Sequence, residues 1–136
     1  MKPVILFDLD GTLLDSLSDI AQCGNRALAL SGLPAHTQEE YRGYIGNGAR
    51  KLVERMLSPA DLPQHLEQVY QDYMRIYGEL CAKGCKPFPG VLEMLRALRQ
   101  AGAATAVISN KPDVQTRLVW QSTFGEALDL AQGQLE

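Results

Sequence analysis

The sequence predicts an α/β protein in which a long helical insertion separates the first two strands of a parallel sheet. Val4–Phe7 is an apolar run without alternation, and the same pattern recurs at Ala103–Ile108. Such runs are typical of strands covered on both faces. Between them the chain shows helical spacing and turn residues, but no strand-like run. Strands that alternate with helices favour a parallel sheet, with any site at the carboxyl ends of the strands.

The helical insertion spans residues 17–82, and we expect it to form its own domain beside a sheet domain of residues 1–16 and 83–136. Its first helix follows Ser16, a possible N-cap, and ends at Gly32-Leu33-Pro34. Thr37-Gln38-Glu39-Glu40 is a capping-box pattern that begins a second helix. A short helix over residues 50–57 and a longer one after Ser58-Pro59 complete the insertion.

The remaining elements return the chain to the sheet. Lys86–Gly90 is a stiff linker, and the apolar spacing after it predicts a helix that ends at Gly102. After the second strand, we expect a helix from near Pro112 to about Phe124. Ala127–Ala131 is the candidate for a third short strand.

Composition excludes several classes of function. The chain has 136 residues, 46% of them hydrophobic, and a formal net charge of −3, which argues against a general nucleic-acid-binding surface. No apolar run approaches the roughly 18 residues of a membrane span, and the N-terminus is a poor signal peptide. The three cysteines make an odd count, so reduced thiols and a cytoplasmic location are expected. From the charge and the lack of a long apolar run, we expect neither nucleic-acid nor membrane partners.

Polar residues end both predicted strands. Asp8, Asp10 and Thr12 follow the first, and Ser109 follows the second, so these side chains should converge at one edge of the sheet. Two carboxylates a few ångströms apart must bind a cation, share a proton, or do both. Mg²⁺ suits such oxygen ligands, and Gly11 allows the sharp exit that the site needs. The alternative is a solvated Asp-Gly turn.

Two motifs carry a family resemblance. "DLDGTLLDS", residues 8–16, resembles the first motif of the haloacid dehalogenase-like hydrolases, and "VISNKP", residues 107–112, resembles their second. The insertion is similar to their small cap domain. Residues 43–57 and 86–102 look closest to the phosphoglycolate phosphatase branch. The resemblance implies a Rossmann-like core and a hydrolase that acts on a small phosphorylated metabolite, with 2-phosphoglycolate favoured.

The same resemblance implies roles for individual residues. Asp8 would be the nucleophile that becomes an aspartyl phosphate, a form of covalent catalysis. Asp10 would protonate the leaving alcohol and then activate water. Ser109 and the backbone N–H of Asn110 would hold phosphoryl oxygens, and Thr12 would support the loop. Mg²⁺ would bind the Asp8 carboxylate and the Asp10 carbonyl.

Further candidates for substrate binding have alternative interpretations. Lys111 resembles a phosphate-neutralising lysine but lies inside the second motif, so it either contacts substrate or is a surface lysine at a helix start. The loop Gly46-Asn47-Gly48 precedes a helix that carries Arg50 and Lys51. A helix N-terminus with nearby cations suits a carboxylate-bearing substrate, and the alternative is a plain turn between helices.

The family's third and fourth motifs, a lysine and an acidic pair, have no match here. The acids after Asn110 are Asp113, Glu126, Asp129 and Glu136, and none lies in the spacing of the acidic pair. We therefore expect the N-terminal part of a phosphatase, with an incomplete core and poor activity on its own. The alternatives are a sugar-phosphate mutase and a non-catalytic fragment that binds metal weakly or associates with other chains through an exposed Val4–Phe7.

Overall fold

The computed structural model describes residues 2–135 and divides into two compact units. The sheet unit comprises the chain up to Ser16 and from Leu80 onward, and the helical unit comprises Leu17–Glu79. Among the described residues, no helix is both long and apolar enough to cross a membrane.

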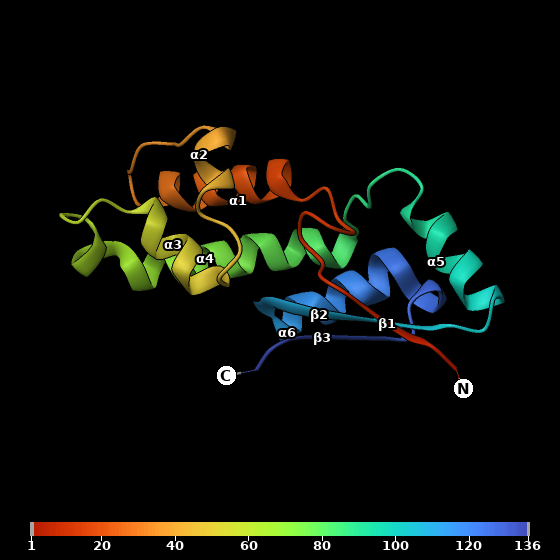
Figure 1. Cartoon of the computed structure of the whole chain (residues 1–136). Helices are drawn as coiled ribbons and strands as arrows, with labels where there is room; N and C mark the ends of the chain where they lie inside the picture. Colours follow the sequence, from red (N-terminus) through yellow and green to blue (C-terminus); the bar gives the residue numbers. More distant parts are fainter. Residues whose placement is uncertain (1, 136) are drawn as a thin grey trace. The chain divides into compact units, whose positions relative to one another are not determined.

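The sheet unit contains a three-stranded parallel sheet, which confirms the predicted fold class (Figure 1). Its strands are β1 (Val4–Phe7), β2 (Ala104–Pro112) and β3 (Leu130–Gln134), in the order β1-β2-β3. Phe7 pairs with Val107. The residues that follow each of them therefore lie at the same carboxyl edge of the sheet.

Two strand boundaries differ from the prediction. β2 does not end before Ser109 but continues to Pro112, and its pairing with β3 shifts register between Ile108 and Pro112. β3 begins at Leu130 rather than at residue 127, because residues 125–127 form a 3₁₀ turn. Asp129 also binds β2 through its side chain: its Oδ2 accepts the N–H of Thr105 at 2.8 Å.

Helices cover one face of the sheet. α5 (Val91–Gln100) contacts β2, and α6 (Asp113–Val119) contacts β2 and β3. A Cβ at Gly133 in β3 would overlap Thr116 of α6, so glycine permits this close packing. The Gly133 N–H donates to Asp113 Oδ1 at 2.9 Å, and this bond, followed by the Arg117 side chain, lowers the pKa of Asp113.

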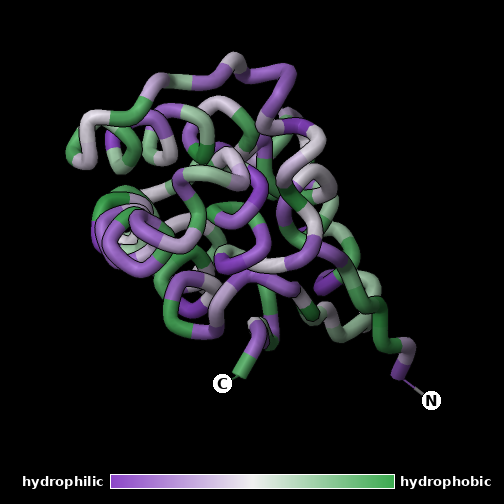
Figure 2. The backbone as a smooth tube through the Cα atoms, turned by 90° about the vertical axis from the view of Figure 1, so that its left-hand side faces the viewer, coloured by the Kyte–Doolittle hydropathy of each residue, from purple (hydrophilic) through white to green (hydrophobic). Residues whose placement is uncertain are grey.

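The opposite face of the sheet is open, contrary to the prediction of strands covered on both faces. Val4 and Leu6 are each 65% exposed, Ile108 is 54% exposed and Leu130 is 48% exposed. Leu6, Ala106 and Leu130 form one row across the strands. The hydrophobic colouring of β1 is visible near the N-terminus in Figure 2. No described element of the sheet unit packs on this side, so β1 is both an edge strand and half uncovered.

The chain after β2 differs in detail from the single helix that was predicted. α6 begins at Asp113, directly after Pro112, and passes into one π-helical segment over Trp120–Phe124. The Trp120 Nε1–H donates to the carbonyls of Gly125 at 3.1 Å and Leu128 at 3.0 Å. These bonds tie the end of the helix to the chain that enters β3.

The helical unit contains the four helices predicted for the insertion. They are α1 (Leu17–Leu30), α2 (Gln38–Arg42), α3 (Ala49–Met56) and α4 (Leu62–Lys83), the last of which continues beyond the unit. The capping box is confirmed, because Thr37 Oγ1 accepts the Glu40 N–H at 3.1 Å and Glu40 Oε1 accepts the Thr37 N–H at 3.0 Å. The N-cap prediction at Ser16 is wrong: its Oγ is buried and makes no hydrogen bond with a described residue.

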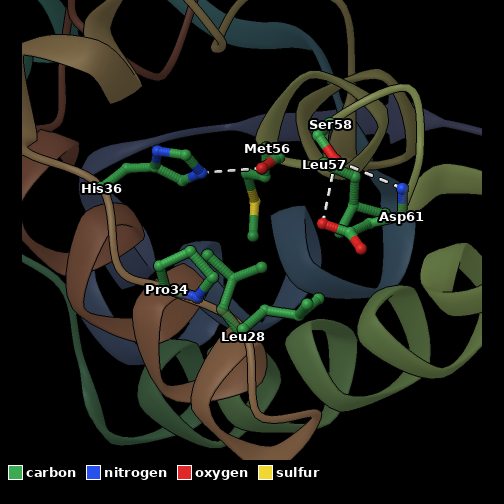
Figure 3. A pocket seen from close by; sticks show the side chains of 8 residues that line it. Leu28, Pro34, His36, Met56, Leu57, Ser58 and Asp61 are labelled. Atoms are coloured by element: carbon green, nitrogen blue, oxygen red, sulfur yellow. Dashed lines mark hydrogen bonds between the residues drawn. The ribbon is translucent and has the colours of Figure 1, made fainter.

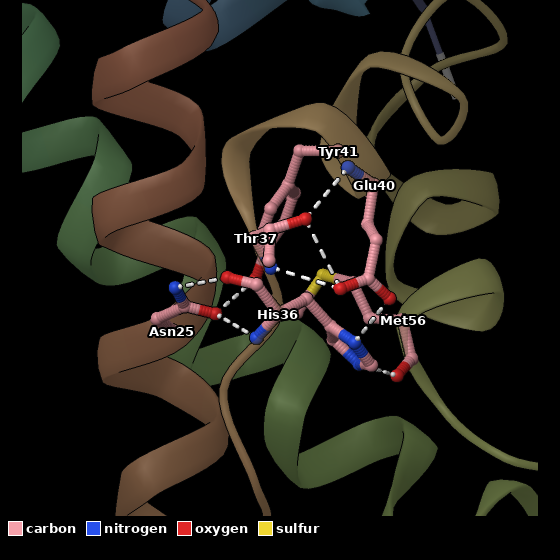
Figure 4. A network of polar contacts seen from close by, with 6 residues as sticks. All are labelled: Asn25, His36, Thr37, Glu40, Tyr41 and Met56. Carbon is pink, nitrogen blue, oxygen red and sulfur yellow. Dashed lines mark hydrogen bonds and ion pairs between the residues drawn. The ribbon is translucent and has the colours of Figure 1, made fainter.

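A polar network joins the first three helices (Figure 4). Asn25 of α1 binds the backbone N–H and carbonyl of His36, each at 2.9 Å, and accepts a hydrogen bond from the Tyr41 hydroxyl. His36 Nε2 lies 2.7 Å from the carbonyl of Met56 in α3, and its Nδ1 lies 3.2 Å from Glu40 Oε2. Burial raises the pKa of the Tyr41 phenol. The network fixes the loop between α1 and α2 against α3.

Candidate functional site

The loop after β1 is a compact turn centred on Leu9. The Leu9 carbonyl accepts the N–H groups of Thr12, Leu13 and Leu14 at 3.2, 2.9 and 3.0 Å. Leu9, Leu13 and Leu14 are buried and anchor the turn. Gly11 has a φ of +79°, a conformation that glycine adopts without strain. The sequence "DLDGTLL" therefore builds a rigid exit from the strand.

Asp8 and Asp10 flank the buried Leu9 and are more accessible than it is. Asp8 is exposed and Asp10 is partly buried, as expected where alternate residues of an extended segment share a side. The Leu9 N–H donates to Asp8 Oδ1 at 2.8 Å. The other Asp8 oxygen makes no hydrogen bond with a described residue.

Ser109, Asn110 and Lys111 occupy the end of β2, where the register shifts. Ser109 is buried, and its Oγ accepts the Lys111 N–H at 3.1 Å. Asn110 is exposed. Thr12 of the first loop is also exposed, and its backbone N–H is bound to Leu9.

One side-chain contact joins the two segments. Lys111 Nζ lies 3.2 Å from Asp10 Oδ1, with the Lys111 side chain 3% exposed and that of Asp10 23% exposed. Asp10 Oδ1 is buried and accepts no hydrogen bond from a described residue, so its contact with Lys111 is an ion pair. It brings together residues that are about a hundred positions apart in the sequence.

These motifs match a known family. A family model described as haloacid dehalogenase-like hydrolase matches residues 5–123. The chain belongs to the haloacid dehalogenase-like hydrolases. The match contains the loop after β1, the insertion and the end of β2.

The proteins to which this chain is similar include phosphatases. The chain is 33% identical over 117 residues to a phosphoglycolate phosphatase of Agrobacterium fabrum, a match that covers 84% of the chain and 50% of the relative. It is 40% identical over 110 residues to one of Caulobacter vibrioides, covering 79% of the chain and 46% of the relative. A crystal structure of a predicted phosphoglycolate phosphatase from Haemophilus somnus gives a TM-score of 0.83 at 29% identity, covering 98% of this chain and 62% of that one. The chain thus spans about half the length of the curated relatives it matches.

In this haloacid dehalogenase-like chain, the predicted substrate residues of the insertion have local partners. Arg50 forms an ion pair with Glu67, and its guanidinium lies 5.3 Å from the ring centroid of Tyr70. Asn47 Oδ1 accepts a hydrogen bond from Arg55 Nη2 at 2.8 Å. Gly46 and Gly48 have φ values of +117° and +89°, so both positions favour glycine. These four residues belong to the helical unit.

Arg55 was not identified from the sequence, although it holds the loop between α2 and α3. Its Nη1 donates to the Tyr44 carbonyl at 3.0 Å, in addition to the bond from Nη2 to Asn47. Arg55 lies eight residues after Asn47. The sequence did contain a signal for this role. An arginine on a short helix can reach back to the loop that precedes the helix.

A small cavity lies within the helical unit (Figure 3). Its volume is about 70 Å³, well below the roughly 300–1,000 Å³ of typical small-molecule pockets. Its polar groups bind one another, as in the hydrogen bond from Ser58 Oγ to Asp61 Oδ2 at 2.9 Å. We therefore assign the cavity to packing between helices. It is lined by Leu28, Leu33, Pro34, His36, Met56, Leu57, Ser58 and Asp61.

The donors for a metal ion at the sheet edge are few. No group of three or more His, Cys, Asp or Glu side chains suited to a metal occurs among the described residues. Asp8 offers an exposed carboxylate, and one oxygen of Asp10 faces Lys111. Oxygen donors fit Mg²⁺, which commonly keeps several waters and takes one or two protein carboxylates plus phosphate oxygens. The residues present therefore fit a partial Mg²⁺ site.

Proposed function

We propose that this chain carries the nucleophilic half of a Mg²⁺-dependent phosphatase active site for small phosphate monoesters. The observation that carries the proposal is the contact between the two motifs at the carboxyl edge of the sheet, where Lys111 lies 3.2 Å from Asp10. Membership of the hydrolase family supports the reaction class. The phosphoglycolate phosphatases among the relatives support 2-phosphoglycolate as the favoured substrate.

Asp8 is the proposed nucleophile. The Leu9 N–H binds its Oδ1, which orients the carboxylate and leaves Oδ2 for attack on phosphorus. The P–O bond to the leaving alcohol breaks as the Asp8–phosphorus bond forms, and Asp10 gives the alcohol its proton. Water then attacks phosphorus and gives a proton to Asp10, the bond between the Asp8 oxygen and phosphorus breaks, and inorganic phosphate leaves with the Asp8 carboxylate restored. Covalent catalysis divides one difficult displacement into two easier ones.

Mg²⁺ would be held by the Asp8 carboxylate and the Asp10 carbonyl. A divalent cation offsets the repulsion between an anionic nucleophile and an anionic ester. Ser109 and the backbone N–H of Asn110 are the proposed partners of the phosphoryl oxygens. Thr12 would support the loop geometry through its place in the turn closed by the Leu9 carbonyl.

The insertion is the proposed source of substrate specificity, and its boundaries remain a proposal. The proposed cap domain comprises residues 17–82, and the compact helical unit Leu17–Glu79 supports this proposal. Gly46, Asn47 and Gly48 would meet the substrate. The pairing of Arg50 with Glu67 weakens the case for Arg50 as a substrate ligand.

Low activity is expected of this chain by itself. It has no match to the family's lysine and acidic motifs, and the loss of one preorganised electrostatic group often costs about 10²–10³ in rate. A non-catalytic role with self-association is the second candidate, favoured by the apolar β1 edge and the open face of the sheet. Unpaired strand edges invite pairing with another chain.

Phosphate release from 2-phosphoglycolate with Mg²⁺ tests the proposal. We expect turnover below the usual enzyme range of about 1–10³ s⁻¹. Asp8→Asn should abolish it, whereas Asp10→Asn should slow it without removing phosphoryl transfer. Glu93→Gln, an exposed acid on α5, serves as the control and should leave the rate unchanged. Near-normal turnover of Asp8→Asn would refute the covalent mechanism, and a transfer of the phosphoryl group to a sugar instead of water would favour a mutase.

A further inference from the structure

The backbone of Lys111 is fixed by its surroundings. Its N–H donates to Ser109 Oγ at 3.1 Å, and its carbonyl lies 3.4 Å from the hydroxyl of Thr116 in α6. A Cβ at Gly133 would overlap that same carbonyl. Groups from β2, α6 and β3 therefore set the position from which the Lys111 side chain extends.

The Lys111 side chain is directed to the interior. It is 3% exposed, and its Nζ lies 3.2 Å from Asp10 Oδ1. Lysine is almost never fully buried unless its charge is paired, because an unpaired ammonium loses its hydration without compensation. The ammonium is thus placed to hold a carboxylate of the protein, and little of it is accessible to a substrate that arrives from solvent.

The contact also orients Asp10. Its Oδ1 is buried, whereas the side chain as a whole is 23% exposed. Oδ1 therefore pairs with Lys111, and the exposed part of the side chain is not the oxygen that faces Lys111. A carboxylate held by one oxygen presents the other in a defined direction, which is the requirement for accepting a proton from the attacking water.

We propose that Lys111 is a positioning residue, whose buried ammonium fixes the Asp10 carboxylate, rather than a ligand of the substrate phosphoryl group. The assignment of a catalytic purpose to this pair rests on the proposed function. The contact between Lys111 and Asp10 itself belongs to the folded chain, and it can be tested without measuring turnover. A failure of phosphate release and a failure of the pairing are therefore separate results.

The first measurement observes the ammonium directly in the folded protein. In wild type, the Lys111 ¹⁵Nζ NMR signal should be protected from rapid exchange with water, and Asp10→Asn should shift it. Lys51, an exposed lysine paired with Glu54, is the matched control and should give no protected signal. A wild-type spectrum without a protected Lys111 signal, or a signal that Asp10→Asn leaves in place, would overturn the proposal.

The second measurement follows the carboxylate. Lys111→Met should move the ¹³C signal of the Asp10 side-chain carboxyl and leave that of Asp8 in place, and Lys111→Arg should restore it in part. A double-mutant cycle of Lys111→Met with Asp10→Asn should show coupling of at least about fivefold in the unfolding constant, within the range for residues in contact. An unmoved Asp10 signal or coupling below about twofold would contradict the proposal. If Lys111→Met does not fold, the comparison of wild type with Asp10→Asn decides the question.

Discussion

At the scale of single residues, alanine substitutions at two helical glycines are expected to have opposite effects on stability. A Cβ at Gly24 of α1 would overlap the ring and hydroxyl of Tyr41, which is buried and bound to Asn25. At Gly78 of α4, a Cβ would meet nothing within 4 Å. Gly24→Ala should therefore destabilise the protein by about 1–3 kcal/mol through overpacking. Gly78→Ala should stabilise it by about 0.8–1 kcal/mol through helix propensity. Denaturant unfolding measures both, and changes of the same sign would contradict the packing of α1 against α2.

The capping box predicts a dependence of stability on pH. The backbone N–H of Thr37, followed by its hydroxyl, lowers the pKa of Glu40 from 4.5. A lowered pKa in the folded state gives stability that is fully present above pH 4.5 and is lost as the pH falls through the folded value.

Glu40→Gln should accordingly lower the thermal unfolding midpoint at pH 7, and the difference from wild type should shrink below pH 4.5. Glu39→Gln is the matched control, because Glu39 is an exposed neighbour that pairs with Arg42, and such surface pairs contribute little. A difference between wild type and Glu40→Gln that grows at low pH would contradict this role of Glu40.

At the scale of elements, Arg55 should govern the loop between α2 and α3. It binds the Tyr44 carbonyl and the Asn47 side chain. Arg55→Ala should speed amide hydrogen exchange in residues 43–48 by about 3–10-fold, as expected if bonds worth roughly 1 kcal/mol are lost. Lys51→Ala, on the same helix, should leave that exchange unchanged. Equal effects of the two variants would show that α3 as a whole, rather than Arg55, holds the loop.

The elements also show what could be predicted from the sequence. Apolar periodicity and caps located the helices, and the unbroken apolar runs located β1 and the start of β2. The end of β2 was missed because its last residues, 109–112, are polar or proline and lie where the register shifts, so their sequence is typical of a loop. β3 was predicted too early because residues 125–127 form a 3₁₀ turn, and Asp129 binds Thr105 through its side chain, a contact that apolar patterning does not show. The sequence predicted that the motif residues lie at the strand ends, but the partners of Lys111, Arg50 and Asn47 depend on tertiary contacts.

At the scale of the whole molecule, the open face of the sheet predicts association. Parallel sheets are normally covered on both faces, whereas Leu6 and Ile108 are 65% and 54% exposed. We expect the protein to form dimers or larger species at micromolar concentration, measurable by light scattering. Leu6→Lys and Ile108→Lys should reduce the average mass.

The control for this prediction is Val114→Lys, because Val114 is exposed on α6 and lies away from the open face. It should leave the average mass unchanged. A stable monomer in wild type, with protected amides throughout β1, would show that the edge and face are covered in another way.

The central claim is that Asp8 is a phosphoryl acceptor, and mass spectrometry of the intact chain tests it most directly. After incubation with 2-phosphoglycolate and Mg²⁺ and a rapid acid quench, we predict a mass increase of one phosphoryl group, located at Asp8 by peptide mapping. The increase should be absent in Asp8→Asn and retained in Asp10→Asn, where hydrolysis of the intermediate is slowed. A chain that remains unmodified in all three forms, or one modified at a residue other than Asp8, would contradict the account.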